Sequence, residues 1–174
     1  SFIEQLQQRY GPVMIIPEGG SNALGVAGCR EIVPLIDQQI QTDYDYIILP
    51  CGTGTSLAGI TSAARCQVLG VVVLKGQHEL QQRIEQQLIS SGYGGCSNWQ
   101  LLHDYHCGGY AKLQPGLIEF VENFKARFGI ALDHIYTGKM FFGIFNLIEA
   151  GYFPDNANIL AIHTGGLQSR SGMS

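Results

Sequence analysis

The sequence predicts an α/β fold: an open, mostly parallel sheet in three layers, with helices on both faces. Short apolar runs alternate with helical segments along the chain, and this alternation is typical of parallel sheets. The runs consist mainly of Ile, Val and Leu without a polar residue at every second position, as in strands buried on both faces. Glycine-rich turns follow several of these runs, where a parallel sheet binds ligands.

Composition indicates a single globular domain. The chain has 174 residues and a hydrophobic content of 45%, enough for one core. Its net charge of −4 and its lack of a Lys/Arg run argue against nucleic acid as a partner. No apolar run approaches the ~20 residues that span a bilayer, so we expect no membrane association. The first residue is not Met, which indicates a processed or truncated product.

The cysteines bear on the cellular compartment. Their number is odd, and they are scattered without paired spacing: Cys29, Cys51, Cys66, Cys96 and Cys107. This pattern predicts free thiols in a reducing compartment, and therefore a cytoplasmic protein.

The first part of the chain is expected to alternate helix and strand. A helix over 1–10 ends at the Gly-Pro pair that follows it, and the apolar run 13–17 is expected to be a buried strand. Ser21 or Asn22 can cap a helix over 22–41. Two glycines near its start suggest close packing: Gly25 and Gly28. Its apolar stripe is expected to consist of four side chains: Ile32, Leu35, Ile36 and Ile40.

The middle of the chain continues the alternation. Strands are expected at 45–50, 67–74 and 99–102, and a helix runs from the turn after the first of these to about residue 65. A second helix, over 77–91, has apolar residues at a spacing of four: Leu80, Ile84 and Leu88.

The last part predicts two helices and a strand. A helix over 114–129 begins near Pro115 and ends at Gly129. Another runs from the 136–139 turn to about residue 150, and the strand covers 158–163. Their inward side chains are expected to be Leu117, Val121, Phe124 and Phe128 in the first helix, and Met140, Ile144, Leu147 and Ile148 in the second. A group of phenylalanines is expected in the core or at a subunit interface: Phe141, Phe142 and Phe145.

Four turns carry the unusual polar and glycine residues: 18–22, 51–56, 136–139 and 163–166. Each turn follows an apolar run or opens a helix. Because ligands of parallel sheets lie beyond the carboxyl ends of the strands, we expect all four turns along one edge.

The turn at 52–56 predicts a phosphate site. Gly52 and Gly54 let a ligand approach the backbone, and Thr53, Thr55 and Ser56 add hydroxyl groups. The N–H groups of the following helix's first turn point at the same place. A plain strand–helix turn is the alternative interpretation. Neither the Rossmann pattern nor the Walker pattern is present, which leaves pyridoxal phosphate or a sugar phosphate as the ligand.

The sequence resembles a known family at four motifs in the same order: Ile16 to Gly25 (IPEGGSNALG), Cys51 to Ser56 (CGTGTS), Tyr136 to Lys139 (YTGK) and Ile162 to Gly166 (IHTGG). They resemble the 1-aminocyclopropane-1-carboxylate deaminase / D-cysteine desulfhydrase family, pyridoxal-phosphate enzymes of fold type II, the tryptophan synthase β class. The resemblance covers the whole chain but only the C-terminal half of a family member. It implies a portion of the large cofactor-binding domain.

The resemblance also implies roles for residues. The cofactor phosphate would lie on Gly52, Thr53, Gly54, Thr55 and Ser56. Tyr136 would stand by the ring and assist proton transfer.

Two threonines fall at positions that face the pyridine nitrogen in such enzymes. Thr137 stands where the deaminases have Glu, and Thr164 stands where other members present a small hydroxyl or thiol. A neutral Thr makes the ring a weaker electron sink, which favours β-elimination over cyclopropane ring opening. We therefore expect elimination from D-cysteine to pyruvate, ammonia and sulfide, a lyase reaction, with the deaminase (hydrolase) reaction as the other possibility. A homodimer is expected from the same resemblance.

The family's Schiff-base lysine and its small domain have no counterpart here. The lysines present are Lys75, Lys112, Lys125 and Lys139, and none stands in the family's Asn-Lys motif. We therefore expect the chain to be inactive alone. A non-catalytic α/β module that binds a phosphorylated metabolite is the alternative function. A nicotinamide-dependent reductase is weaker, because no acidic ribose ligand follows the third strand.

Other candidate residues have simpler interpretations. A metal cluster of Cys96, His103, His106 and Cys107 matches no common zinc spacing, so we expect no metal. Cys51 precedes a helix and is a possible nucleophile, but a small buried residue is the favoured reading. His163 is expected to be a hydrogen-bonded core histidine rather than a base, and Glu18 is expected to cap or orient its glycine turn.

Overall fold

A computed structural model describes residues 2–110, 112 and 114–167. Within them lies one four-stranded sheet with the order β3-β2-β1-β4, and every neighbouring pair is parallel. The strands are β1 (Tyr46–Cys51), β2 (Gln67–Val72), β3 (Trp99–Leu102) and β4 (Ile159–Ala161). The open parallel sheet confirms the predicted fold class.

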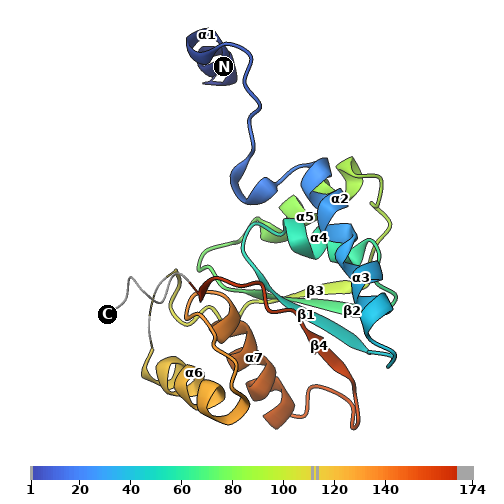
Figure 1. Cartoon of the computed structure of the whole chain (residues 1–174), viewed down its shortest axis with the longest axis vertical. Helices are drawn as coiled ribbons and strands as arrows, with labels where there is room; N and C mark the ends of the chain where they lie inside the picture. Colours follow the sequence, from blue (N-terminus) through green and yellow to red (C-terminus); the bar gives the residue numbers. More distant parts are fainter. Residues whose placement is uncertain (1, 111, 113, 168–174) are drawn as a thin grey trace.

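Helices cover both faces of the sheet and complete three layers (Figure 1). One face carries α2 (Ala23–Arg30), α3 (Ile32–Gln39), α4 (Thr55–Thr61) and α5 (Leu80–Ser90), and the other carries α6 (Pro115–Phe128) and α7 (Thr137–Glu149). A short 3-10 turn, η1 (Glu18–Gly20), precedes α2, and α1 (Phe2–Tyr10) stands apart from the layers.

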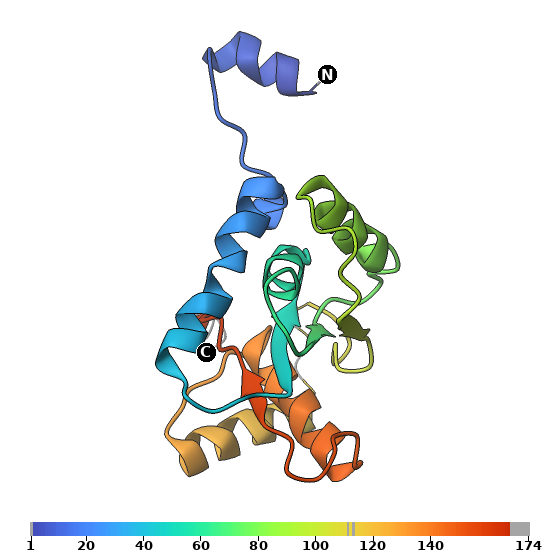
Figure 2. The same ribbon diagram turned by 90° about the vertical axis from the view of Figure 1, so that its right-hand side faces the viewer.

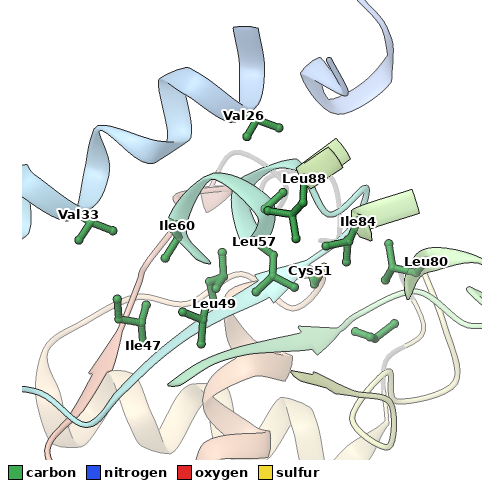
Figure 3. Close-up of a cluster of buried hydrophobic side chains, with 13 residues drawn as sticks. Val26, Val33, Ile47, Leu49, Cys51, Leu57, Ile60, Leu80, Ile84 and Leu88 are labelled. Carbon is green, nitrogen blue, oxygen red and sulfur yellow. The ribbon is translucent and has the colours of Figure 1, made fainter. Parts of the chain in front are cut away.

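Strand β1 divides the core because its side chains alternate between the two faces. Ile47 and Leu49 belong to the cluster under α2 to α5, which Figure 3 shows around Leu57. Ile48 points to the opposite face and packs with Met140 of α7. A strand buried on both faces needs apolar residues at every position, which is why this run lacks polar alternation.

The predicted strand at 13–17 is wrong. These residues run as an extended segment between α1 and the body, and they pair with no strand of the described chain (Figure 2). Met14 and Ile16 are 87% and 74% exposed. A β-strand needs a hydrogen-bonded neighbour, so apolar composition alone does not make one.

The predicted helix over 22–41 is two helices, α2 and α3, that meet at Glu31. Pro34 explains the break, because its ring has no N–H and clashes with the carbonyl of Arg30. The predicted stripe is also wrong in part, since Val33 is buried whereas Leu35 is 54% exposed.

The glycines of α2 behave differently from each other. A Cβ on Gly25 would lie 2.0 Å from the carbonyl oxygen of Gly20, so this position requires glycine. A Cβ on Gly28 would meet nothing within 4 Å, so the close packing expected there is absent.

Other differences concern helix ends and outward faces. Helix α4 ends at Thr61 rather than near residue 65. Leu80, Ile84 and Leu88 of α5 are buried as predicted, but Phe128 and Ile148, expected inward, are 45% and 50% exposed. Gly129 ends α6 with φ 70°, as its position predicts. Across the described residues, every helix is too short or too polar to cross a membrane.

Candidate functional site

The 52–56 loop forms a cradle of backbone amides at the carboxyl end of β1. Gly54 turns the chain with φ 91° and directly precedes α4. The N–H groups of Thr55, Ser56 and Leu57 lie in the first turn of α4 and have no hydrogen-bond partner among the described residues, as at any helix start. The loop encloses a cavity of about 50 Å³. An anion of phosphate size is the guest that free amides at a helix N-terminus favour.

The tight turn requires glycine at position 54. A Cβ there would lie 2.4 Å from Cγ1 of Ile84, so α5 packs directly against the loop backbone. The side chain of Gln87, one turn later in α5, donates from Nε2 to the carbonyl oxygen of Thr53 at 3.3 Å. Helix α5 therefore holds the outer side of the cradle.

The 18–22 turn packs against the same loop. A Cβ on Gly19 would lie 2.2 Å from Oγ1 of Thr53, and the hydroxyls of Ser21 and Thr55 lie 3.1 Å apart. The Ser21 hydroxyl also donates to the carbonyl oxygen of Glu18 at 2.8 Å. Asn22 caps α2 by accepting from the N–H of Gly25 at 2.8 Å, as the sequence predicts.

Tyr136, at the start of α7, lies beside Gly52 of the cradle. A Cβ on Gly52 would lie 3.4 Å from Cε1 of this tyrosine and 3.8 Å from its hydroxyl. Burial raises the pKa of the Tyr136 phenol, and the neighbouring Tyr110, Asp133 and Glu18 raise it further. The phenol is therefore protonated at neutral pH and can donate a proton.

Asp133 fixes the backbone at Tyr136. Its Oδ1 accepts from the N–H groups of Ile135 and Tyr136 at 2.8 and 2.7 Å, and its Oδ2 accepts from the N–H of Thr137 at 2.8 Å. The side chain is fully buried. One carboxylate thus satisfies three amides at the N-terminus of α7, where the helix dipole also favours negative charge.

Thr137 is part of the same network. Its hydroxyl donates to Oδ2 of Asp133 at 2.6 Å and accepts from the N–H of Asp133 at 3.0 Å. Both functions of the hydroxyl are used within the protein, so the buried Thr137 braces the turn. The exposed Thr164 has no such partner among the described contacts.

The 163–166 turn reaches the same cluster. His163 bonds through Nε2 to the carbonyl oxygen of Ala131 at 2.9 Å and accepts through Nδ1 from the N–H of Gly165 at 3.1 Å. Both ring nitrogens are engaged, which agrees with a hydrogen-bonding rather than a basic role, although the side chain is exposed and not in the core. A Cβ on Gly166 would lie 3.3 Å from Oδ2 of Asp133.

All four turns therefore meet at one edge of the sheet. The 18–22 turn contacts the 52–56 loop, Gly52 contacts Tyr136, and the 163–166 turn contacts Asp133. The 52–56 and 163–166 turns follow β1 and β4, as the parallel topology predicts for ligand-binding turns, whereas the 18–22 and 136–139 turns reach the same edge without a preceding strand among the described residues.

Other candidate residues from the sequence are the cysteines, the histidines near them and Glu18. Cys51 is 2% exposed, and burial raises its pKa to about 12, so it is protonated and unsuited to nucleophilic attack at neutral pH. All five cysteines are free, as predicted. No group of three His, Cys, Asp or Glu side chains in the described part of the chain is placed to hold a metal ion. Glu18 contributes its carbonyl to the turn, while its side chain is exposed.

Sequence reasoning assigned no role to three residues of the site. Asp133 could have been found, because an Asp just before a helix is a capping signal. Tyr110 is one of the groups that raise the pKa of the Tyr136 phenol, but a loop tyrosine has no sequence signature. Lys139 is fully buried, and a single Lys in a helix gives no sign of burial.

Comparison with known proteins identifies the family. The model of the family "pyridoxal-phosphate dependent enzyme" matches residues 1–165. The chain belongs to this family. A protein of Pyrococcus furiosus with the provisional name 1-aminocyclopropane-1-carboxylate deaminase is 29% identical over 176 residues, which cover 94% of this chain and 53% of that protein.

Two further relatives and one solved structure are also similar to this chain. A mitochondrial bifunctional D-cysteine desulfhydrase/1-aminocyclopropane-1-carboxylate deaminase of Arabidopsis thaliana is 30% identical, covering 94% of this chain and 44% of that protein. A D-cysteine desulfhydrase of Salmonella newport is 31% identical, covering 87% and 50%. The crystal structure of a 1-aminocyclopropane-1-carboxylate deaminase homologue superposes with a TM-score of 0.84 at 27% identity, covering 94% of this chain and 52% of that one. The chain spans about half the length of these proteins.

The residues present fit the phosphate end of pyridoxal phosphate. The cradle offers unpartnered amides at the N-terminus of α4, and Gly52 leaves open the space beside Tyr136 that a Cβ would enter. No lysine bonds into the cradle among the described residues: Lys139 is bonded elsewhere, and Lys75, Lys112 and Lys125 are exposed.

Proposed function

We propose that the protein carrying this chain is a pyridoxal-phosphate-dependent lyase that eliminates sulfide from D-cysteine, giving pyruvate and ammonia. The observation that carries the proposal is the position of Tyr136, whose ring lies 3.4 Å from the Cβ that Gly52 lacks. A protonated phenol thereby stands beside a phosphate cradle. The names of the relatives support D-cysteine or 1-aminocyclopropane-1-carboxylate as substrate.

The 52–56 loop is the proposed binding site of the cofactor phosphate. We assign the cofactor phosphate to the N–H groups of this loop, with Thr53, Thr55 and Ser56 as hydroxyl donors. When bound, pyridoxal phosphate supplies an electron sink for the substrate. Gly52 keeps the space between the loop and Tyr136 clear.

Proton transfer falls to Tyr136. The phenol is protonated at neutral pH and can hydrogen-bond the sulfur as it leaves, assisting proton transfer there, while burial raises its pKa and makes it a weaker acid than a free tyrosine. Thr164 is assigned to the pyridine nitrogen, and Thr137 acts through Asp133 by holding the turn. Neither threonine supplies a charge at the ring, which favours elimination over ring opening.

The chain is taken to be the C-terminal part of this enzyme, with the lysine that anchors the cofactor and the small domain contributed by the rest of the protein. We therefore expect the chain alone to be inactive. Of the two reaction classes expected from the sequence, we retain the lyase and drop the hydrolase, because loss of sulfide from D-cysteine, the reaction in the name of two relatives, is an elimination. A homodimer and a cytoplasmic location stay predictions.

The test is release of the 2-oxo acid by the complete protein with cofactor: pyruvate from D-cysteine, with L-cysteine (pyruvate) and 1-aminocyclopropane-1-carboxylate (2-oxobutyrate) as comparison substrates. We expect turnover of D-cysteine and a loss of about 100-fold or more in kcat in Tyr136→Phe. The chain alone serves as the negative control. No turnover of any of the three substrates, together with retained binding of pyridoxal phosphate, would favour the non-catalytic binding module instead.

A further inference from the structure

Lys139 is a fully buried lysine to which the proposed reaction assigns no task. It lies in the first turn of α7, three residues after Tyr136, and is 0% exposed. Its Nζ donates to the carbonyl oxygen of Val73 at 3.1 Å and to that of Gly109 at 2.6 Å. Burial lowers the pKa of the amine, an effect that Cys107 and Asp133 partly oppose.

Burying an ammonium group is costly unless its hydrogens are satisfied. Among the described residues, the partners of Lys139 are two main-chain carbonyls and no carboxylate. An apolar side chain would fill the same space without that cost. What the amine adds is a link between segments far apart in the sequence, the chain just after β2 and the loop at 103–110.

The linked loop is tightly turned where Lys139 binds it. Gly109 is buried with φ 116°, and a Cβ there would lie 3.2 Å from Cβ of Lys75. Its N–H donates to the carbonyl oxygen of His106 at 3.0 Å, and its carbonyl oxygen also accepts from the N–H of Lys112 at 3.3 Å. The contact from Lys139 thus holds the centre of a compact turn.

The residue that follows this turn is Tyr110. Its side chain is 63% exposed, and it is one of the groups that, after burial, raise the pKa of Tyr136. Lys139 is bonded to the main chain one residue before Tyr110, and it shares the first turn of α7 with Tyr136. The same amine is therefore joined to the segments that carry both phenols.

We propose that Lys139 is a positioning residue that fixes Tyr110 relative to the start of α7, where Tyr136 lies, by holding the carbonyl of Gly109. This assignment rests on the proposed function for its catalytic meaning, because Tyr136 lies beside Gly52 of the phosphate cradle. The geometric part stands independently of the reaction. Lys139 acts through Tyr110 and does not itself reach the cradle.

The first test needs no substrate. The complete protein is labelled with ¹³C-tyrosine, and the pKa of Tyr136 is read by NMR titration in the parent, in Tyr110→Phe and in Lys139→Met. We expect the pKa of Tyr136 to fall in Tyr110→Phe and to fall by a similar amount in Lys139→Met. Lys125→Met, which removes an exposed lysine of α6, is the matched control and leaves it unchanged. A parent-like pKa of Tyr136 in Lys139→Met overturns the proposal.

The second test is a double-mutant cycle on kcat with D-cysteine. Lys139→Met is expected to lower kcat by about tenfold with a smaller change in KM, and to cost less than about twofold in the Tyr110→Phe background. Additive losses overturn the assignment, because a merely structural role would weaken both backgrounds equally. If the parent has no turnover, the proposed function fails while the titration still decides the position of Tyr110.

A third measurement covers the case in which Lys139→Met does not fold. In the unsubstituted protein, amide exchange at Gly109 and Lys112 is expected to be at least about 100-fold slower than at the exposed Gly76 and Gly95. In Lys139→Arg, which keeps a charged donor, this protection is expected to persist. Exchange at Gly109 as fast as at the two reference glycines overturns the proposal.

Discussion

The two sides of the candidate site are built in different ways. The cradle side is made by the backbone: glycines at positions 19, 25, 52 and 54 let chains approach, and the amides of α4 face the ligand. The tyrosine side is made by buried polar side chains, with Asp133 holding the start of α7 and Lys139 holding the neighbouring loop. The cradle side therefore depends on glycines, which have no side chain, whereas the tyrosine side depends on hydrogen bonds from two buried side chains.

Removal of the Asp133 carboxylate is expected to have the largest effect on stability. Asp133→Ala leaves three amides and the Thr137 hydroxyl without their acceptor in a fully buried place, so unfolding free energy should fall by about 3 kcal/mol. Urea denaturation measures this loss. Asp155→Ala, at an exposed position, is the control and should be neutral. A loss below about 1 kcal/mol would mean that side-chain bonds do not hold the tyrosine side.

Addition of one methyl group to the cradle tests the other side. Gly54→Ala combines a left-handed φ of 91° with a contact of 2.4 Å to Ile84, and should cost about 2 kcal/mol. Gly20→Ala is the matched control, because its φ of 64° is also left-handed but its Cβ meets nothing within 4 Å. Equal losses of stability in the two variants, measured by thermal denaturation, would show that the contact with Ile84 adds nothing to the cost of the left-handed φ.

Substitution of Gly52 is expected to weaken cofactor binding with little change in stability. Its φ lies outside the left-handed region, and its Cβ would stand 3.4 Å from the Tyr136 ring. Gly52→Ala should therefore fold with a change below about 0.5 kcal/mol but bind pyridoxal phosphate about tenfold more weakly. Equilibrium dialysis of the cofactor checks this. Unchanged affinity would show that the space beside Tyr136 is not used by the ligand.

The smallest expected effect is an increase in stability. Gly28 lies within α2, and a Cβ there meets nothing within 4 Å. Gly28→Ala should stabilise the protein by about 0.5–1 kcal/mol, because alanine loses less backbone entropy in a helix. A chemical denaturation curve shifted to lower denaturant would contradict the open space at this position.

The sequence predicted the cradle side better than the tyrosine side. Glycine and hydroxyl residues after an Ile/Leu run have a local signature, so the 52–56 loop and the Asn22 cap were visible without a structure. Asp133 bonds residues two to four positions away and has a local capping signal, whereas Lys139 acts through contacts with segments 30 and 66 residues away, which local patterns do not encode. The strand expected at 13–17 failed for the same reason, because pairing depends on a neighbour that the run itself cannot supply.

Thr137 illustrates the difference within one residue. Its place in the 136–139 motif was visible in the sequence and implied a contact with the cofactor ring. In the structure its hydroxyl bonds twice with Asp133, at 2.6 and 3.0 Å, and the contact with the ring stays a prediction. The motif therefore located Thr137 in the sequence, but only the structure shows that its hydroxyl bonds Asp133.

The central proposal is that the cradle at 52–56 binds the phosphate of pyridoxal phosphate. Titration of pyridoxal phosphate into the ¹⁵N-labelled complete protein, followed by amide chemical shifts, tests it most directly. The proposal predicts that the largest shifts occur at the amides of Thr53, Gly54, Thr55 and Ser56, and that pyridoxal without phosphate leaves them nearly unchanged. Largest shifts elsewhere, or equal shifts with pyridoxal, would contradict it.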